Sequence, residues 1–417
     1  MNLHFRHSAA ASVFRGVGVL RGLAAVFAFG IVSAGTAWAQ PSDPLPPGTV
    51  TLGPFRITPS LVLREMGVDD NVFNESTDPK RDFTFTLTPR ADVLFRMRRL
   101  RLSYTTVTDY VYYRTYKSER GTNTSSSARL EFDLGSLKPY VTATGLNSKN
   151  RLNAEVDERA RHRDVVYQAG VSLRLASRTT LLLSGLQGKV AYEPDARKFR
   201  GVDLRESFNG TKRSIDAGLG VALTPITTFT MGVSREEQRY RFSQNRDADS
   251  WRISPSFAFT PGGLLSGSAT VGYRRFHTLS PTLPDYRGVV GAATVAATLF
   301  ARHHLAGTFS RDVQTSYDVG TAYYLGTGAT LTYTVRLAGP IDARGTGARQ
   351  RMDYSISGVP VGRDLLTSYG GGIGYRFSDH ARLGVNAEWS RRGSDREFER
   401  TYRNHRIFAG LTWGLTL

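Results

Sequence analysis

The sequence predicts an all-β fold, a transmembrane antiparallel β-barrel of about 18 strands with short periplasmic turns and longer extracellular loops. Two patterns support this fold class. From Phe55 onward, runs of about ten residues alternate between apolar and polar side chains, as expected of strands whose two faces meet different surroundings. The connections between these runs are short and long in turn, which is typical of outer-membrane barrels.

The first 39 residues have the features of a signal peptide. Three arginines accompany an apolar run over 22–35, and Ala37-Trp38-Ala39 offers a cleavage site between small residues. The alternative is a membrane anchor, but the apolar run is shorter than the roughly 20 residues that a spanning helix needs. The segment therefore predicts export and says nothing about activity.

The mature chain is expected to begin at Gln40. Residues 40–53 hold four prolines and are expected to form an extended periplasmic linker. The barrel is expected to occupy 54–417, because the period-2 alternation continues to the end of the chain.

The composition limits the classes of partner. The chain of 417 residues has no cysteine, so it must be stable without disulfides although it is exported. Its formal net charge is +18, or +15 (18 − 3) without the three arginines of the signal. Such a charge suggests nucleic acid, a polyanion or a charged membrane surface. Nucleic acid is not expected, because the protein is exported and carries no nucleic-acid-binding motif.

One run illustrates the alternation. In SWRISPSFAFT, over 250–260, Trp251, Ile253 and Phe257 lie on one face of the expected strand and Arg252 lies on the other. No helical period of 3.6 residues competes with this pattern. The segment is therefore expected to be a strand with an apolar face and a polar face.

The connections give the strand count. Eight short turns are expected near 98–99, 135–137, 176–178, 225–227, 261–263, 301–303, 337–340 and 378–380. Nine longer polar loops are expected at 67–81, 117–124, 151–163, 192–212, 242–248, 278–285, 315–322, 355–363 and 394–401. Together they join 18 strands, and both chain ends lie on the short-turn side. Alternation is weakest over 341–354, and 16 strands is the fallback.

A soluble sandwich or propeller is the alternative architecture, with the apolar faces in a dry core. Three features favour the membrane barrel: the rhythm of the connections, a polar face that carries arginine, and aromatic residues near strand ends. Examples of these aromatic residues are Tyr110, Tyr240, Tyr375 and Trp389.

The chain ends on AGLTWGLTL, over 409–417, in which Trp413, Leu415 and Leu417 share the apolar face. This terminal strand is expected to pair with the first strand, near Phe55–Leu63, because a closed barrel leaves no exposed edge. It also resembles the C-terminal signal read by the barrel assembly machinery, which is an expected partner. Such signals commonly end on Phe, whereas this chain ends on Leu.

Five arginines are expected to line the pore, because they share the polar parity of their strands. A basic lumen concentrates anions and favours their passage, and the arginine fork binds carboxylate and phosphate. The alternative is that these charges pair with lumenal acids such as Asp164 and Asp216. The five are Arg101, Arg174, Arg252, Arg274 and Arg376.

A second basic set falls in the expected loops. These residues are candidates for contact with phosphates of outer-membrane lipid and glycolipid in the outer leaflet, or they are ordinary loop charges with acids interspersed. They are Arg159, Arg161, Arg163, Arg197, Lys198, Arg200, Lys212, Arg391, Arg392, Arg396, Arg400 and Arg403.

From Gly67 the sequence reads GVDDNVFNESTDPKRDFTFTLTPRADV. It has an Asp-Asp-Asn turn with an aromatic residue, then a polar loop, then a strand with proline near its end. This resembles the start of the putative beta-barrel porin family, particularly its EpsL-like members associated with exopolysaccharide operons. The resemblance implies an outer-membrane role in secreting or anchoring surface polysaccharide. The matching residues are Asp69, Asp70, Asn71, Phe73, Ser76, Asp78 and Pro89.

Without the resemblance, Asp69-Asp70-Asn71 is first a turn, because Asp and Asn side chains cap turns. An acidic pair in a loop is also compatible with a calcium ion at the cell surface.

A search for catalytic chemistry finds no set of residues. The histidines are scattered without ligand spacing, and His303-His304 falls in an expected turn. Neither a nucleophile elbow nor a phosphate-binding loop occurs. No catalytic, cofactor-binding or metal-binding residues are expected, and the protein is not expected to be an enzyme.

The functional hypothesis is an outer-membrane pore that acts in export or surface presentation of exopolysaccharide, by passive conduction through a basic lumen. Polysaccharide and envelope export components would then be partners. The first alternative is a general or anion-selective porin for small solutes. The second is a structural or adhesive barrel with a blocked lumen. The sequence leaves the oligomeric state open.

Overall fold

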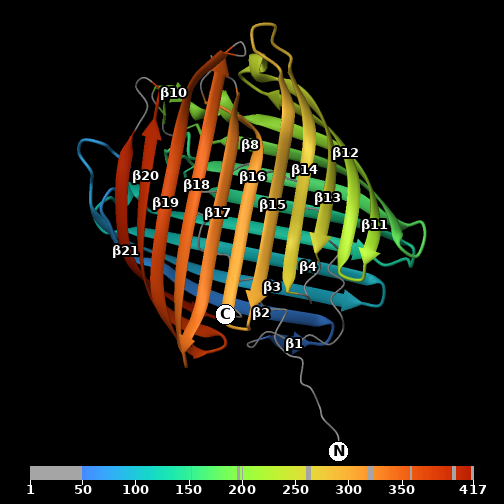
Figure 1. Cartoon of the computed structure of the whole chain (residues 1–417), viewed down its shortest axis with the longest axis horizontal. Coiled ribbons are helices and arrows are strands. Elements are labelled where there is room, and N and C mark those ends of the chain that lie inside the picture. The colour runs from blue at the N-terminus through green and yellow to red at the C-terminus, as the bar shows by residue number, and fades with distance from the viewer. Residues whose placement is uncertain are drawn as a thin grey trace, which may run out of the picture.

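The computed structural model shows a closed antiparallel β-barrel (Figure 1). Its sheet has 19 strands, of which the short β1 pairs with β2. The other 18 (19 − 1) each pair with the next strand along the chain, and β21 pairs with β2. The predicted 18-strand barrel is confirmed. The structure describes residues 49–151, 153–194, 198–199, 201–259, 264–317, 321, 323–356, 359–396 and 401–414.

The barrel strands are β2 (Phe55–Asp69), β3 (Asp82–Met97), β4 (Leu100–Tyr113), β5 (Gly121–Phe132), β6 (Leu137–Ser148), β7 (His162–Arg174), β8 (Thr179–Tyr192), β11 (Gly210–Thr224), β12 (Thr227–Tyr240), β13 (Ala248–Phe259), β14 (Leu265–Thr278), β15 (Tyr286–Leu299), β16 (His303–Thr315), β17 (Tyr323–Ala338), β18 (Ile341–Ile356), β19 (Val359–Ser378), β20 (Ala381–Ser394) and β21 (Tyr402–Trp413). The other elements are β1 (Val50–Leu52), η2 (Lys117–Glu119), β9 (Lys198–Phe199), β10 (Val202–Asp203), α1 (Leu204–Phe208) and η3 (Gln244–Arg246). Among the residues described, no helix has the length and apolar character needed to cross a membrane.

The alternation of side chains fixes which face of a strand turns outward. On β14, Val271 and Tyr273 are 59% and 52% exposed, whereas Arg274 and Phe276 on the opposite face are buried. The neighbouring β15 repeats the pattern, with Val289 57% exposed. An apolar face that stays exposed across many strands suits a lipid surrounding better than water.

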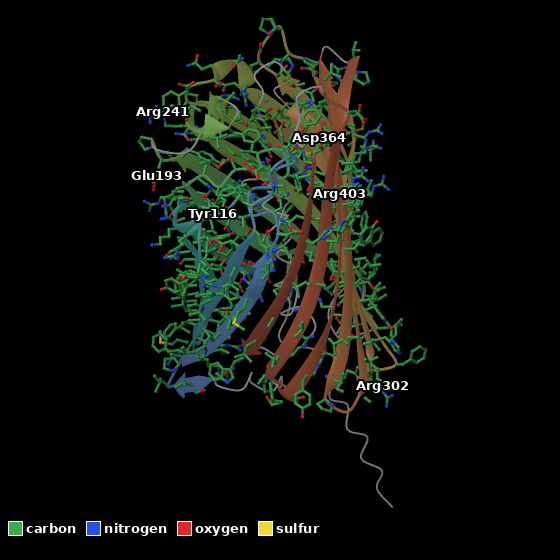
Figure 2. The ribbon with its side chains drawn as sticks, turned by 90° about the vertical axis from the view of Figure 1, so that its left-hand side faces the viewer. Tyr116, Glu193, Arg241, Arg302, Asp364 and Arg403 are labelled. Carbon is green, nitrogen blue, oxygen red and sulfur yellow. The ribbon has the colours of Figure 1, made fainter. Side chains whose placement is uncertain are left out.

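The two ends of the barrel differ in the length of their connections. The strands end and begin at all eight predicted short turns, and these turns share one end. Figure 2 shows this contrast, with Arg302 in a short turn at one end and Glu193 and Arg241 in longer connections at the other. In Figure 1 the near strands cross the far strands at a large angle, as expected when the strands of a barrel tilt.

One predicted loop is wrong. The segment 355–363 was expected to be a long connection, but β18 continues to Ile356 and β19 starts at Val359. A register shift after Tyr354 keeps the two strands paired beyond the point where alternation fades. The segment 341–354, where alternation is weakest, lies within β18, because hydrogen bonds to both neighbouring strands hold it in the sheet.

The barrel closes as the terminal sequence predicts. Leu61 of β2 lies opposite Trp413 of β21, and Leu63 lies opposite Leu411. The register shifts between Leu63 and Met66, where Glu65 has a φ of 57°, so β2 carries an irregularity at the seam. Leu415 and Leu417 lie outside the described residues.

The predicted signal peptide, 1–39, and most of the predicted linker also lie outside the described residues. At the end of that linker, Val50–Leu52 forms β1 and pairs with Phe55–Ile57 of β2. These residues therefore add a short hairpin to the short-turn end of the barrel, where Figure 1 places β1.

Candidate functional site

Arg252 and Arg274, two of the five predicted pore residues, belong to an ionic network on the inward face. Arg274 donates to Glu236 on β12 at 2.8 Å and to Asp312 on β16 at 2.7 Å. Arg252 on β13 lies 3.5 Å from Asp312, and Lys212 on β11 lies 2.7 Å from Glu236. Three cations thus share two carboxylates over six neighbouring strands.

Arg274 reaches Asp312 across an intervening strand, β15. The β15 residue opposite Arg274 is Gly288, which has no side chain to block the path. Arg274 is only 4% exposed, so its charge depends on these two carboxylates.

Arg376, a third predicted pore residue, belongs to a second network near the short-turn end. Asp342 on β18 is fully buried and accepts from Arg376 at 2.7 Å and from Arg382 at 2.6 Å. Arg382 lies over two glycines: a Cβ on Gly374 would be 2.2 Å from its Nη2, and one on Gly384 would be 2.6 Å from its Nη1. The glycines of β19 and β20 therefore make room for this guanidinium group.

The second network has more cations than acids. Arg336 on β17 lies directly opposite Asp342 in the register. Arg344 has no ion pair within the described residues, and its buried Nε has no hydrogen-bond partner there. Arg376 and Arg382 thus contact Asp342, while Arg336 lies opposite it in the register and Arg344 lies two residues further along the same face of β18.

Arg101 and Arg174 lie near the short turns and are exposed. Arg101 faces Glu131 in the register of β4 and β5. Their role in lining the pore stays a prediction. The acids weighed as partners lie elsewhere, with Asp164 next to His162 at 3.9 Å and Asp216 bonded to Ser214 at 3.0 Å.

The Asp-Asp-Asn segment forms a hydrogen-bonded turn at the long-loop end. Asp69 Oδ1 accepts from the backbone N of Asn71 at 3.0 Å and from Asn404 Nδ2 at 2.9 Å. Asn71 Nδ2 donates to the carbonyls of Glu75 and Arg403, both at 2.8 Å. The motif thus joins the first loop to the last strand at the closing seam.

The two remaining residues of this motif, Asp70 and Phe73, also contact residues distant in the sequence. Asp70 accepts from the backbone N of His405 at 2.6 Å, and the Phe73 ring meets the Tyr116 ring edge-on at 4.9 Å. Within the described chain, no group of three or more His, Asp or Glu residues could hold a metal ion. These bonds support the turn and give no support to a calcium site.

Several basic residues predicted in loops belong to strands, because the strands extend beyond the apolar band. Arg159, Arg161 and Arg396 lie in connections, and Arg197, Arg200 and Arg400 lie outside the described residues. Lys198 lies in β9, within the β8–β11 connection. Those within barrel strands are Arg163, Lys212, Arg391, Arg392 and Arg403.

The connection between β6 and β7, residues 149–161, folds into the barrel, and we call it the mouth loop. Glu155 and Val156 are fully buried. Arg392 on the inward face of β20 donates to the Ala154 carbonyl at 2.7 Å and to Asp364 of β19 at 2.7 Å. The mouth loop therefore reaches the wall formed by β19 and β20, far from β6 and β7 along the barrel.

Two further attachments hold the mouth loop. Glu155 accepts from Ser316 Oγ at 2.6 Å and from the Tyr317 backbone N at 3.1 Å, in the connection after β16. Asp157 accepts from Asn74 of the first loop at 2.7 Å and forms an ion pair with Arg151 at 2.5 Å. The loop is thus fastened to three separate parts of the barrel rim.

An apolar cluster supports these polar bonds. It joins the mouth loop to the β8–β11 connection and to the β16–β17 connection, and two of its rings, Phe199 and Tyr317, meet edge-on at 4.8 Å. Burial of such side chains stabilises the inward position of the loop. The cluster contains Val156, Ala160, Tyr192, Phe199, Leu204 and Tyr317.

Burial raises the pKa of the Glu155 carboxyl from 4.5 to about 7. The bonds from Ser316 and Tyr317 lower the pKa, and Arg396 and Arg392 lower it less, but desolvation dominates. Glu155 is therefore a titratable group near neutral pH inside the loop that occupies the mouth.

Sequence reasoning missed the mouth loop and the acids of the two networks. Loop length and mixed charge do not distinguish 149–161 from the other long connections. The acids had one usable signal: Glu236, Asp312 and Asp342 all have inward parity. Which arginine each acid meets depends on the curvature of the barrel, and parity does not contain that information.

The family model described as Putative beta-barrel porin 2 matches residues 43–414. Comparison with curated protein sequences finds no match. Among solved structures, Pseudomonas aeruginosa OccK3 (OpdO) is 14% identical, with 85% of this chain and 95% of that chain covered and a TM-score of 0.47. P. aeruginosa OccK2 (OpdF), in complex with glucuronate, is 11% identical, with 86% and 98% covered and a TM-score of 0.49. The FrpB iron transporter from Neisseria meningitidis is 10% identical, with 81% and 62% covered and a TM-score of 0.41. Similarity at this level carries no information about substrate.

Proposed function

The chain belongs to the Putative beta-barrel porin 2 family and is an outer-membrane β-barrel porin, and on that premise we propose that it passively conducts small hydrophilic solutes, with a preference for anions. The observation that carries the proposal is the mouth loop, which is fastened inside the barrel at three places. A loop held there narrows the passage, and a narrower passage favours small solutes over a polymer.

The preference for anions is supported by the second inward network. There, Arg376 and Arg382 contact Asp342, Arg336 lies opposite it in the register, and Arg344 on the same face of β18 has no ion pair in the described chain. Excess positive charge on a pore wall raises the local concentration of anions.

Export of exopolysaccharide, which the resemblance to EpsL-like proteins implies, stays a prediction that no observation here tests. A polymer would have to displace the mouth loop and break its bonds to Ser316 and Arg392. Under the present proposal, a deletion strain keeps its extracellular polysaccharide. Loss of the polymer, restored by the intact gene, would favour the conduit.

The first test is conduction. The purified barrel is reconstituted in planar bilayers and in liposomes, with a size series from monosaccharide to pentasaccharide. We expect discrete conductance steps and a sharp fall in permeation with size. Absence of current would favour a blocked, structural barrel.

The second test concerns the mouth loop. Replacing 153–158 with a short glycine linker should raise conductance and admit larger sugars. The matched control shortens the exposed β14–β15 connection by removing 280–283, and should leave both properties unchanged. Equal conductance of the two variants would show that the mouth loop does not limit passage.

The third test concerns charge. Arg344→Gln should lower the anion-to-cation permeability ratio, measured as a reversal potential in a salt gradient. Arg349→Gln, on the outward face of the same strand, is the matched control. A ratio that stays unchanged in Arg344→Gln would contradict the anion preference and leave the porin function standing.

A further inference from the structure

The outward face near the long-loop end carries exposed arginines on seven of the barrel strands. They alternate with exposed apolar side chains, such as Tyr273 beside Arg275 and Val289 beside Arg287, so they point away from the lumen. We call this set the outer arginine belt. It consists of Arg213, Arg235, Arg275, Arg287, Arg349, Arg391 and Arg403.

The sheet register places like charges side by side in this belt. Arg275 of β14 lies directly opposite Arg287 of β15, and Arg391 of β20 lies directly opposite Arg403 of β21. Like charges in such cross-strand pairs repel each other and destabilise the sheet. A bound anion between the two guanidinium groups would reverse the sign of that contribution.

None of these four arginines has a salt bridge to another described residue of the chain. The acid closest in sequence to the first pair is Asp285, and its carboxylate bonds to His277 at 2.9 Å and to the Thr278 backbone N at 3.1 Å. Elsewhere on the outward face, arginines do have acidic partners, as in Arg351 with Asp353 at 2.7 Å. The two like-charge pairs are therefore the places where an external anion fits.

Aromatic residues mark the height of the belt. Trp389 lies two positions before Arg391 on the same outward face and stacks on Tyr369, with ring centroids 5.6 Å apart. Trp251 is 53% exposed and lies between Arg235 and Arg275 in the register. Tryptophan and tyrosine favour the boundary between hydrocarbon and headgroups. Two residues along a strand span roughly 7 Å. Arg391, which lies two residues beyond Trp389, is therefore at the level of the headgroups.

Among the described residues, the opposite rim shows no such belt. At the short-turn end, the outward positions of β19 next to the turn are Tyr375 and Phe377, and both are exposed. Arg99 and Arg302 lie in the turns themselves, and Figure 2 shows Arg302 at this end. The strand arginines there, such as Arg376 and Arg382, belong to the inward face. The charge on the outer surface is thus concentrated at the long-loop end, which faces the outer leaflet in outer-membrane barrels.

We propose that the outer arginine belt binds the phosphate groups of glycolipids in the outer leaflet, with the pairs Arg275–Arg287 and Arg391–Arg403 each holding one phosphate. Guanidinium groups form two parallel hydrogen bonds to phosphate oxygens, and a phosphate between two arginines replaces their repulsion with attraction. The proposal concerns the outer surface and is independent of what passes through the pore.

The test uses the full barrel in an uncharged detergent. Its melting temperature and its bound lipids, by native mass spectrometry, are measured with bisphosphorylated lipid A, with dephosphorylated lipid A and with phosphatidylglycerol. The belt variants are Arg275→Gln/Arg287→Gln and Arg391→Gln/Arg403→Gln. The matched control, Arg99→Gln/Arg302→Gln, removes the same charge from the opposite rim.

We expect bisphosphorylated lipid A to bind the wild type and the control, and to bind each belt variant about tenfold more weakly or less, because charge-assisted bonds are lost. Without lipid, each belt variant should melt at or above the wild-type temperature, because the repulsion is gone; with lipid A the order should reverse. Equal affinity of belt variants and wild type would overturn the proposal. So would equal binding of dephosphorylated lipid A or of phosphatidylglycerol.

Discussion

Substitution of Glu155 tests whether the mouth loop responds to pH. In the inward loop the pKa of this carboxyl is about 7, against 4.5 in water. The inward position therefore binds a proton more tightly than a released loop does. The stability that this proton gives to the inward position is fully present below pH 4.5. It decreases as the pH rises toward 7 and does not change further above that pH.

The size of the effect follows from the shift. The difference between about 7 and 4.5 corresponds to about 3 kcal/mol, or roughly a factor of 300 in the equilibrium between inward and released loop. The structural reason for the raised pKa lies in the groups that hydrogen-bond to Glu155. Glu155 receives bonds from a hydroxyl and a backbone N–H, while Arg392, the nearby cation, donates to Asp364 and to the loop carbonyls.

Single-channel recording between pH 4 and 8 measures this equilibrium. The wild type should spend more time in the low-conductance state at acidic pH. Glu155→Gln resembles the protonated acid and keeps an acceptor for Ser316. This variant should therefore stay mainly in the low-conductance state over the whole pH range. Glu237→Gln, which neutralises a carboxylate paired with Arg235 on the outward face, away from the mouth loop, should follow the wild type. A Glu155→Gln profile identical to the wild type, or a wild type that closes on raising the pH, would refute the reasoning.

Two further predictions concern buried cations. Gly374→Ala places a methyl group 2.2 Å from Arg382 Nη2, so it should displace that guanidinium group. The reversal potential in a salt gradient should then change. An unchanged potential would mean that Arg382 does not influence the permeating ions. Arg392→Ala leaves Asp364 buried without its 2.7 Å partner, and should destabilise the barrel by about 3–5 kcal/mol in urea unfolding followed by heat-modifiable gel mobility. Arg391→Ala removes the exposed neighbouring arginine and should lower the free energy of unfolding far less. Equal decreases in the two variants would show that loss of the buried ion pair does not cause the destabilisation.

Most of the wall was predictable from sequence, because period-2 alternation reports a local property. Each strand meets lipid on one side and a polar interior on the other, so every residue contributes to the alternation. Even 341–354, where alternation is weakest, lies in the predicted strand, β18. The failure at 355–363 is instructive. There the strands rise above the apolar band, the outward face no longer needs apolar residues, and alternation stops before the hydrogen bonds do.

The interior was less predictable, because it depends on contacts between distant parts of the chain. The parity of Arg274 could be read from its neighbours, but its partner Asp312 lies two strands away and is reached only because Gly288 is between them. The mouth loop shows the same limit. Glu155 meets Ser316 across 161 positions of sequence, and no local pattern encodes that pairing.

The distribution of arginine over the two faces changes the meaning of the net charge of +18. A basic composition first suggests a basic lumen. Inside, however, Arg274, Arg376 and Arg392 each have a buried or half-buried carboxylate within 2.7–2.8 Å, so much of the inward charge is neutralised locally. Outside, the pairs Arg275–Arg287 and Arg391–Arg403 form no salt bridge with a described residue of the chain. An exposed arginine without an acidic partner in the chain is available to an anion from outside the protein. We therefore expect the second network to interact with passing anions and the belt with anionic lipid, so selectivity and lipid binding should respond independently to substitutions on the two faces.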